Sequence, residues 1–498
     1  MPQLNSTPWR GLMATLGLLA LAGCNFAPPY VTPQSSAPAA FKETPGWAPA
    51  TPGDDRPRGA WWTLFGDQTL DTLEAQAPIA NPTLQAALAT YDQARAFAAE
   101  AGSYLVPTVG LNDSNTYNRQ SAERPLRGAG QPNEYAVNTV GPVVSYEFDF
   151  WGRVRNLAAA GGAQAQASAA DLATAQLSLQ VQLADFYLSL RGLDAQNQLL
   201  QNTVAAYQRA LDLTKARHTG GVASGLDVDR AQAQLSSAKA QISDVLAQRA
   251  LYEHAIASFV GQPASSFSIA PATGQRIVPD APTGVPSALL QRRPDIAAAE
   301  RRAFAANRQI GVARAAYFPT ISLDALGGWQ NTGGNNLLTA PNTFWTLGPQ
   351  LAFSLFDGGL RKAQVAASRA AFTLASANYR ATVLTAFQQV EDQLALTKHY
   401  GNEETDERDA VTAAQATTHL SLIRYREGAT NYLDVVTAQA AELQAEQTLL
   451  ALQTRRQLAS VNLVRALGGG WDRSDLPSLG RASAPVANLG SDLAGHTH

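Results

Sequence analysis

The chain has 498 residues, of which 45% are hydrophobic and 15% charged, and its formal net charge is −3. This near-neutral balance argues against nucleic acid as a partner, because phosphate binding requires a concentrated basic face. The single cysteine, Cys24, excludes an intramolecular disulfide framework.

The first 23 residues predict a secretory signal peptide. Arg10 precedes an apolar run over 11–20 that is too short to span a bilayer, and small residues follow it. The run ends in Leu-Ala-Gly-Cys at Cys24, which resembles a bacterial lipobox, in which the cysteine is lipidated and becomes the new N-terminus. A covalent lipid on Cys24 is the only cofactor that we expect. An ordinary signal peptide with an incidental cysteine is the alternative. Because Asn25 is not an aspartate, the resemblance favours delivery to the outer membrane.

Residues 24–60 are rich in proline, alanine and threonine, which predicts an extended, lipidated tether. The rest of the chain contains an internal repeat, which defines its organisation. Six residues recur at one offset of 207 positions: Gly221, Leu226, Asp227, Val228, Ala231 and Gln232 match Gly428, Leu433, Asp434, Val435, Ala438 and Gln439. We therefore predict a first structural repeat over 61–292, a second over 293–470, and a C-terminal tail over 471–498.

Each half has the order short helix, two strands, very long helix, tip and second helix. The long helix of the first half, predicted at about 156–218, carries an apolar residue at every seventh position: Leu172, Leu179, Phe186, Leu193, Leu200 and Tyr207. Such a sustained repeat is typical of a coiled-coil seam. The short helices at 81–104 and 226–260 together match its length, so we expect them to lie end to end beside it.

Four strands are predicted, near 105–118, 135–150, 320–330 and 344–356. Apolar and polar residues alternate most clearly over 144–150. This alternation is typical of membrane barrel strands, although a half-buried soluble sheet alternates in the same way. No run of about eighteen apolar residues follows Cys24, and together with the secretion signal this favours a closed barrel. Since membrane barrels begin near eight strands, several chains would contribute to one barrel.

Several motifs then occur in one order along the chain. They are Trp61–Asp67 (WWTLFGD), Asn81–Leu84 (NPTL), Arg292–Ile296 (RRPDI) with Glu300, Ile310–Arg314 (IGVAR) leading into Tyr317–Pro319, Phe356–Gly359 (FDGG) and the two tip segments. With these motifs the chain resembles the TolC superfamily. Within it the match is to the OprM/NodT-like outer-membrane efflux lipoproteins of RND-type tripartite pumps. The resemblance covers the chain from Cys24 to about Trp471.

The resemblance implies a mainly α fold with a membrane β-barrel. A homotrimer would form a 12-stranded barrel and a coiled-coil α-helical barrel that extends from the outer membrane of a Gram-negative bacterium into the periplasm. An equatorial belt would include residues 61–77, 263–290, the region near 401–409, and the tail. The implied partners are outer-membrane lipid, a periplasmic adaptor and an inner-membrane pump of the RND type. The implied function is passive conduction of drugs or other small molecules.

The family places a gate at the periplasmic tips, and this implies roles for a small set of residues. The implied aperture consists of Asp434, Tyr425, Asp227, Thr430 and Thr437. Asp434 would form a ring of carboxylates that selects cations, and Tyr425 would donate a hydrogen bond to Asp227 of the neighbouring tip. Thr437 and Thr430 stand where TolC-like members often have an aspartate and an arginine, which implies a weaker anionic ring and a different network at the gate. Helix capping is the alternative role for both aspartates.

Small, weakly charged residues at the two tips are the implied adaptor contacts: Gly221, Val222, Ala223, Ser224, Gly428, Ala429 and Asn431. Small residues permit close backbone approach, whereas a plain loop is the alternative. No enzymatic activity and no metal site are expected, since the six histidines lack ligand spacing and no phosphate-binding loop occurs. The rival functions are a periplasmic adaptor or a structural coiled-coil lipoprotein. Among channels, a protein-secretion or metal-efflux duct also remains open.

Overall fold

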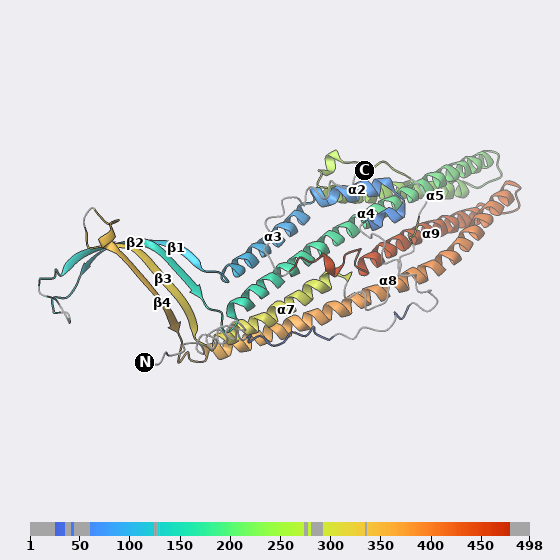
Figure 1. The fold of residues 1–498 in the computed structure, drawn as a ribbon. Coiled ribbons are helices and arrows are strands. Elements are labelled where there is room, and N and C mark those ends of the chain that lie inside the picture. Colours follow the sequence, from blue (N-terminus) through green and yellow to red (C-terminus); the bar gives the residue numbers. More distant parts are fainter. Residues whose placement is uncertain are drawn as a thin grey trace.

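The computed structural model describes residues 25–34, 41–43, 60–123, 125, 128, 130–272, 277–279, 292–333 and 336–478. The predicted signal peptide, Cys24 and residues 479–498 lie outside these ranges. The molecule is elongated, with a sheet at one end and a long helical trunk that ends in two tips at the other (Figure 1).

The trunk consists of long helices that run side by side. The helices are α2 (Gln68–Ala80), α3 (Pro82–Ser103), α4 (Arg153–Thr219), α5 (Gly225–Phe259), α7 (Pro294–Ala315), α8 (Leu360–Arg426) and α9 (Tyr432–Ala466). Helices α3 and α5 pack on successive parts of α4, and α7 and α9 do the same on α8 (Figure 1). Short 3-10 turns lie at Trp61–Phe65, Ala264–Ser266, Ala340–Asn342 and Arg473–Asp475.

The internal repeat has a direct structural counterpart. Helices α4 and α8 each have 67 residues, and Leu360 begins α8 207 positions after Arg153 begins α4. Helices α5 and α9 each have 35 residues and begin at the same offset. At 1.5 Å per residue, α4 and α8 are each about 100 Å long. Helix α4 begins three residues before the predicted start, because the Asp149 carboxylate accepts hydrogen bonds from the amides of Val154 and Arg155 at 3.0 and 2.8 Å.

The predicted heptad positions of α4 form its packed face. Four of the six residues in the first row are buried: Leu179, Leu193, Leu200 and Tyr207. The second half repeats the pattern, since Val383, Phe387, Val390 and Leu394 of α8 are buried. Burial of a seam at this period, with polar residues on the other faces, explains how such long helices pack side by side in one trunk.

The sheet is antiparallel, with the order β1-β2-β3-β4. Its strands are β1 (Thr108–Arg119), β2 (Glu134–Glu147), β3 (Thr320–Asn331) and β4 (Thr343–Ala352). Strand β1 starts three residues after the predicted start, since Leu105 and Val106 form a turn onto the end of α3 and Pro107 has no amide hydrogen. Strands β2 and β4 end before the predicted 150 and 356, where Asp149 and Asp357 instead bind the first amides of α4 and α8.

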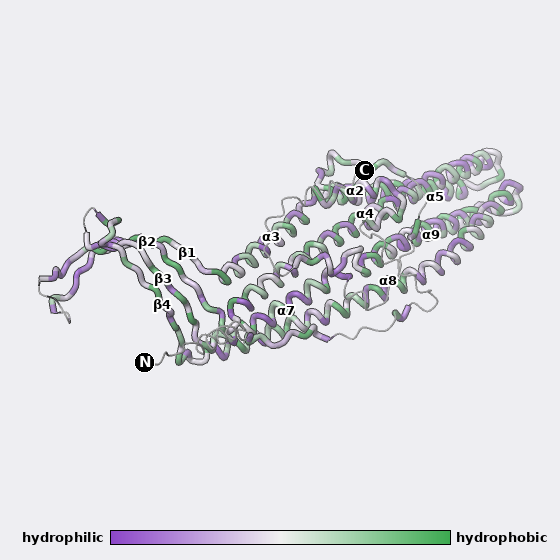
Figure 2. The backbone as a smooth tube through the Cα atoms, viewed as in Figure 1, coloured by the Kyte–Doolittle hydropathy of each residue, from purple (hydrophilic) through white to green (hydrophobic). Residues whose placement is uncertain are grey.

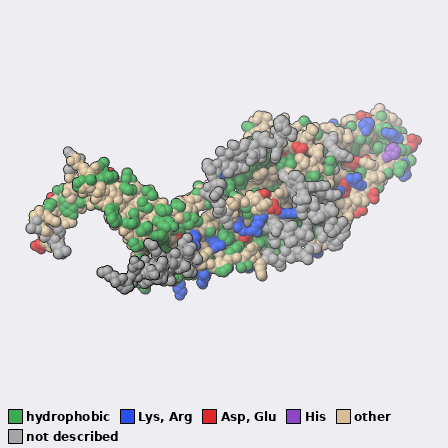
Figure 3. All heavy atoms as spheres, viewed as in Figure 1, with side chains coloured by type: hydrophobic (Ala, Val, Ile, Leu, Met, Phe, Trp, Pro, Cys, Tyr) green, Lys and Arg blue, Asp and Glu red, His purple; other side chains and the backbone are tan. Residues whose placement is uncertain are grey.

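Hydrophobic side chains gather over the sheet, whereas charged ones lie mostly over the trunk and its far tips (Figure 3). Alternate residues of the two edge strands are highly exposed: Val109, Leu111 and Tyr117 on β1, and Trp345, Leu347 and Leu351 on β4. Along the trunk, hydrophobic and hydrophilic positions interchange at short intervals (Figure 2). Within the described residues, no helix has a stretch that is both long and apolar enough to cross a membrane.

The described part of the predicted tether packs against the trunk rather than extending away from it. The Phe26 ring stacks on Phe318 with centroids 4.5 Å apart, and the Tyr30 hydroxyl donates to the Glu300 carboxylate at 2.9 Å. Farther along, Phe41 is buried against α8, and the Lys42 amide donates to Glu391 at 2.7 Å. Residues 25–34 and 41–43, which we call the strap, therefore lie along α7 and α8 through these aromatic contacts.

The regions expected in an equatorial belt differ in structure. Residues 61–77 fold as a 3-10 turn followed by most of α2, whereas residues 401–409 continue α8 without a break. The described start of the tail docks on α4 and α7, where Trp471 and Leu476 contact Ala170 and its neighbours. The rest of the tail, and residues 273–276 and 280–291, lie outside the described ranges.

Candidate functional site

The two tips have the same backbone turn. Gly221 and Gly428, 207 positions apart, have φ of +75° and +74°, which a residue with a side chain rarely adopts. The amide after each glycine returns to the helix: Val222 donates to the Arg217 carbonyl and Ala429 to the Arg424 carbonyl. These bonds satisfy carbonyls at the helix ends in the pattern of a Schellman motif. The next helix then starts at once, so each turn is short and rigid.

The predicted adaptor-contact residues lie at the surface of these turns. Gly221, Val222, Ser224, Gly428, Ala429 and Asn431 are exposed and Ala223 is partly exposed. Val222 is 67% exposed, and Leu226 and Leu433 at the starts of α5 and α9 are also exposed. The end of the trunk is thus a small surface on which each tip exposes an apolar side chain.

Asp434 lies on the exposed first turn of α9. Its carboxylate accepts a hydrogen bond from the Thr430 hydroxyl, and its amide donates to the Asn431 side chain at 3.2 Å. Asn431 is therefore the N-cap of α9, which leaves the Asp434 carboxylate oriented by Thr430 rather than used as the cap. The Thr437 hydroxyl bonds to the Leu433 carbonyl of its own helix at 3.0 Å.

Asp227, the repeat equivalent of Asp434, has a different environment. It completes a capping box with Ser224, accepting from the Ser224 hydroxyl at 3.0 Å while its own amide donates to that hydroxyl at 3.2 Å. Arg230 lies 3.7 Å from its carboxylate. The capping role considered for Asp227 is therefore present in the structure.

Within the chain, Tyr425 does not donate to Asp227. Its hydroxyl is buried without a hydrogen-bond partner among the described residues. The ring instead packs in a cluster formed by both hairpins, 5.2 Å from the ring of Tyr432. Burial, and then the neighbouring Tyr425, raises the pKa of Tyr432 to about 12. The Tyr432 phenol therefore stays neutral at physiological pH, which suits an apolar contact.

Arg217 is a residue of the tips that the sequence did not single out. Its guanidinium lies 4.8 Å from the centroid of the Tyr425 ring, and its Nη1 donates to the Arg426 carbonyl at 3.1 Å. The contact joins the last turn of α4 to the last turn of α8. No sequence pattern pairs these residues, since the repeat aligns Arg217 with Arg424 and not with Tyr425.

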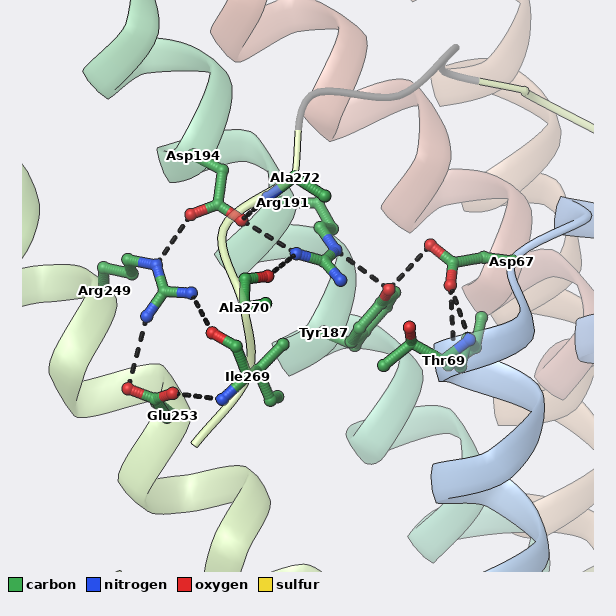
Figure 4. Close-up of polar contacts among 11 residues, drawn as sticks. Asp67, Thr69, Tyr187, Arg191, Asp194, Arg249, Glu253, Ile269, Ala270 and Ala272 are labelled. Carbon is green, nitrogen blue, oxygen red and sulfur yellow. Dashed lines mark hydrogen bonds and ion pairs between the residues drawn. The ribbon is translucent and has the colours of Figure 1, made fainter. Parts of the chain in front are cut away.

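A second polar cluster, the waist network, lies midway along the trunk (Figure 4). Asp194 of α4 is 4% exposed and accepts from Arg249 Nε at 2.6 Å and from Arg191 Nη1 at 2.9 Å. The two arginines also donate to the carbonyls of Ile269 and Ala270 at 2.6 and 2.8 Å. The network thereby fixes the segment after α5 across the α4/α5 hairpin.

The waist network continues to the start of α2. The Tyr187 hydroxyl accepts from Arg191 Nε at 2.8 Å and donates to the Asp67 carboxylate at 2.6 Å (Figure 4). The other Asp67 oxygen caps α2 by accepting from the amides of Thr69 and Leu70. One chain of hydrogen bonds therefore joins α2, α4, α5 and the segment after α5 at a single level of the trunk.

Comparison with known proteins gives consistent matches over nearly the whole chain. The family described as outer membrane efflux protein matches residues 73–262 and 285–469. Outer membrane protein OprJ of Pseudomonas aeruginosa is 33% identical over 469 residues, which cover 93% of this chain and 97% of OprJ. The toluene efflux pump outer membrane protein TtgF of Pseudomonas putida is 32% identical, over 91% of this chain and 95% of TtgF.

A solved structure agrees in fold. The open state of the Neisseria gonorrhoeae MtrE outer membrane channel matches with a TM-score of 0.78 at 25% sequence identity. The match covers 91% of this chain and all of the MtrE chain. The sheet, the trunk and the paired tips thus recur together in a solved outer-membrane channel.

Proposed function

Because the chain belongs to the outer membrane efflux protein family, we propose that three copies assemble into one duct that passes small molecules outward without changing them. The protein is an outer-membrane efflux channel whose trunk extends into the periplasm. This assignment selects the channel over the periplasmic adaptor and the structural lipoprotein.

The two edges of the four-stranded sheet are the observation that supports a trimer. Strands β1 and β4 are its two edges, and each pairs with a neighbour of this chain on one side only. Backbone groups at such an edge need partners, above all in lipid. Three sheets joined β1 to β4 would form a closed 12-stranded barrel. The exposed alternate residues of β1 and β4 would then face lipid with apolar side chains such as Leu111 and Trp345.

The tips would meet the next components of the pump. They lie at the opposite end of the trunk from the sheet, which puts them deepest in the periplasm (Figure 1). The small tip residues, with the exposed Val222 at one of them, would contact a periplasmic adaptor, and the adaptor would connect the duct to an inner-membrane pump of the RND type. Short, rigid turns support such a docking role, because little conformational entropy is lost when they bind.

Asp434 would line the narrow end of the duct. Its carboxylate is exposed and oriented by Thr430, and three copies would place three such charges near one axis. A ring of carboxylates attracts cations and repels anions. Thr437 adds no second charge one turn later, so a single ring would carry the selectivity.

Ion conduction tests the duct and the aperture together. We expect purified trimers in planar bilayers to give small, cation-selective currents, and Asp434→Ala to reduce the ratio of cation to anion permeability about threefold or more. Asp229→Ala, which removes an exposed carboxylate from the other tip, is the matched control and should leave the ratio unchanged. A folded trimer that conducts no ions would refute the duct, whereas equal selectivity in the two variants would refute only the Asp434 ring.

The lipid on Cys24 is part of the same proposal. Cys24 lies outside the described residues, but the residues that follow it are held at the base of the sheet. Asn156 Nδ2 donates to Asn25 Oδ1 at 2.9 Å, and the Arg314 guanidinium donates to the Phe26 carbonyl at 3.2 Å. An acyl group on the preceding residue would thus start at the boundary between the sheet and the trunk, where the inner leaflet would lie.

Mass spectrometry tests this modification directly. We expect the mature protein from a Gram-negative host to begin at a diacylated Cys24, and Cys24→Ala to lose the lipid mass. Since the strap makes its own contacts, through Phe26 and Tyr30 among others, the variant should still assemble when it is supplied with an ordinary signal peptide. An unmodified thiol in the wild-type protein would contradict the proposal.

A further inference from the structure

The matching positions of the two tips carry different side chains. His218 and Tyr425 are 207 positions apart, at the same point of the repeat. His218 is exposed, and its Nδ1 lies 2.9 Å from the Ala223 carbonyl oxygen of its own turn. Tyr425 is 4% exposed and packs between the hairpins against residues of α4, α5 and α9. At this position of the repeat, the α8/α9 hairpin therefore places an aromatic ring between the two hairpins, whereas the α4/α5 hairpin does not.

Arg217 of α4 reaches across that contact. Its guanidinium covers the Tyr425 ring at 4.8 Å, within the range of a cation–π interaction. Its Nη1 donates to the carbonyl of Arg426, the last residue of α8, at 3.1 Å. The last carbonyls of a helix lack intrahelical donors and carry the negative end of the helix dipole. One side chain thus binds both the ring and the end of α8.

The charge of Arg217 is directed at these two groups. In the part of the chain that the structure describes, it makes no ion pair with a carboxylate, unlike Arg191 and Arg249 of the waist network. The approach is close, since a β-carbon built on Gly428 would lie 3.9 Å from the Arg217 Nη2 atom. Planar contact with a ring and a directed N–H bond suit arginine better than lysine.

We propose that Arg217 is a positioning residue of the periplasmic gate, which holds the α8/α9 hairpin against the α4/α5 hairpin and so keeps the resting channel narrow. The proposal rests on the channel function proposed above. It requires α8 and α9 to move together when the channel opens, because the Arg217 contacts end on α8 while Tyr425 also packs against Tyr432 of α9. Breaking the contact would release the tip of one hairpin without altering the fold of either.

Single-channel recording of the full-length trimer tests this role. We expect Arg217→Ala to raise the ratio of open to closed time about tenfold, the scale of one partly buried cation–π contact. Arg217→Lys should give a smaller increase, because the charge remains but the planar contact is lost. Arg424→Ala is the matched control. It removes the same charge from the exposed, repeat-equivalent position and should gate as the wild type does.

Two substitutions of Tyr425 separate the ring from its hydroxyl. Tyr425→Phe should behave as the wild type, because the hydroxyl has no partner among the described residues. Tyr425→Leu should raise the open ratio as Arg217→Ala does, and the double variant should add little beyond either one. The unfolding midpoint of each trimer should stay close to that of the wild type, which separates positioning from a general loss of structure.

The proposal is overturned if a folded Arg217→Ala trimer gates as the Arg424→Ala control does. If Arg217→Ala does not assemble, the gating of Arg217→Lys and of Tyr425→Phe tests the contact instead. A shift in the lysine variant alone supports the contact, and a shift in the phenylalanine variant alone overturns it. A wild-type trimer that carries no current contradicts the proposed duct. If the Arg217→Ala trimer also unfolds at a clearly lower temperature than the wild type, then Arg217 is only a structural residue and the positioning role fails as well.

Discussion

We expect Asp194→Ala to destabilise each protomer by about 3–5 kcal/mol, the cost of breaking a buried ion pair from one side. Asp194 is buried and holds Arg191 and Arg249, and it also accepts from the Ala272 amide at 3.2 Å. Removing the carboxylate leaves two arginines in a low-dielectric region without their counter-charge. Thermal unfolding of the purified trimer, followed by far-ultraviolet circular dichroism, measures the loss.

The same variant should also release the segment after α5. Ile269 and Ala270 are fixed by the two arginines, so their region should become sensitive to limited proteolysis before the trunk helices unfold. Asp212→Ala on the exposed face of α4 is the control, since among the described residues that carboxylate accepts only a surface bond from Gln208. Its effect should stay within about 0.5 kcal/mol. Equal midpoints for the two variants would show that the waist network adds nothing to stability.

Glu74→Gln should stabilise the protein at pH 7.5 and leave it unchanged at pH 4.5. Glu74 of α2 is 1% exposed, and neither carboxylate oxygen has a hydrogen-bond partner within the described residues. Burial raises the pKa of this carboxyl from 4.5 to about 9. The folded state therefore keeps a proton that the unfolded chain releases above pH 4.5, and stability falls as the pH rises from 4.5 towards 9. Over the three units to pH 7.5 the loss is about 4 kcal/mol.

Glutamine has nearly the same shape as glutamate and cannot ionise, so the stability of the variant should not fall as the pH rises. Unfolding midpoints of wild type and variant, measured from pH 4.5 to pH 8, should meet at the acidic end and diverge as the pH rises. Glu100→Gln makes the same change at an exposed position of α3 and should run parallel to the wild type. Parallel curves for Glu74→Gln as well would show that Glu74 is ionised in the folded protein.

The helices were predictable because their packing is local and periodic. The seven-residue rows from Leu172 predicted the long helix α4, whose observed start lies three residues before the predicted one, and the 207-residue offset predicted a second half with a matching tip. The strands were predictable in place but not in length. Their ends depend on single side chains, such as Asp149 and Asp357, which accept hydrogen bonds from the first amides of the next helix. The alternation of apolar and polar residues does not reveal where such a side chain ends the strand.

The side-chain contacts between distant elements were not predictable from the sequence. The cation–π contact of Arg217 with Tyr425 joins the two halves, and the bond from Arg249 to Ile269 joins α5 to the chain that follows it within the first half. No periodicity fixes the relative rotation of these elements. For Tyr425, the resemblance implied a role for the hydroxyl, whereas within the chain the ring makes the contacts. The composition of the strap is typical of linkers and predicts a tether, because its few aromatic anchors do not change that composition.

The equal lengths of the two hairpins restrict how the trunk can evolve. Deleting one heptad from α4, with the matching residues from α5, would preserve both seams but shorten one hairpin by about 10 Å. The two tips would then end at different depths, and a partner that binds all of them at once would reach only the longer hairpin. Changes in the reach of the trunk must therefore arise in both halves of the gene together, in steps of seven residues, although each half alone would tolerate the change.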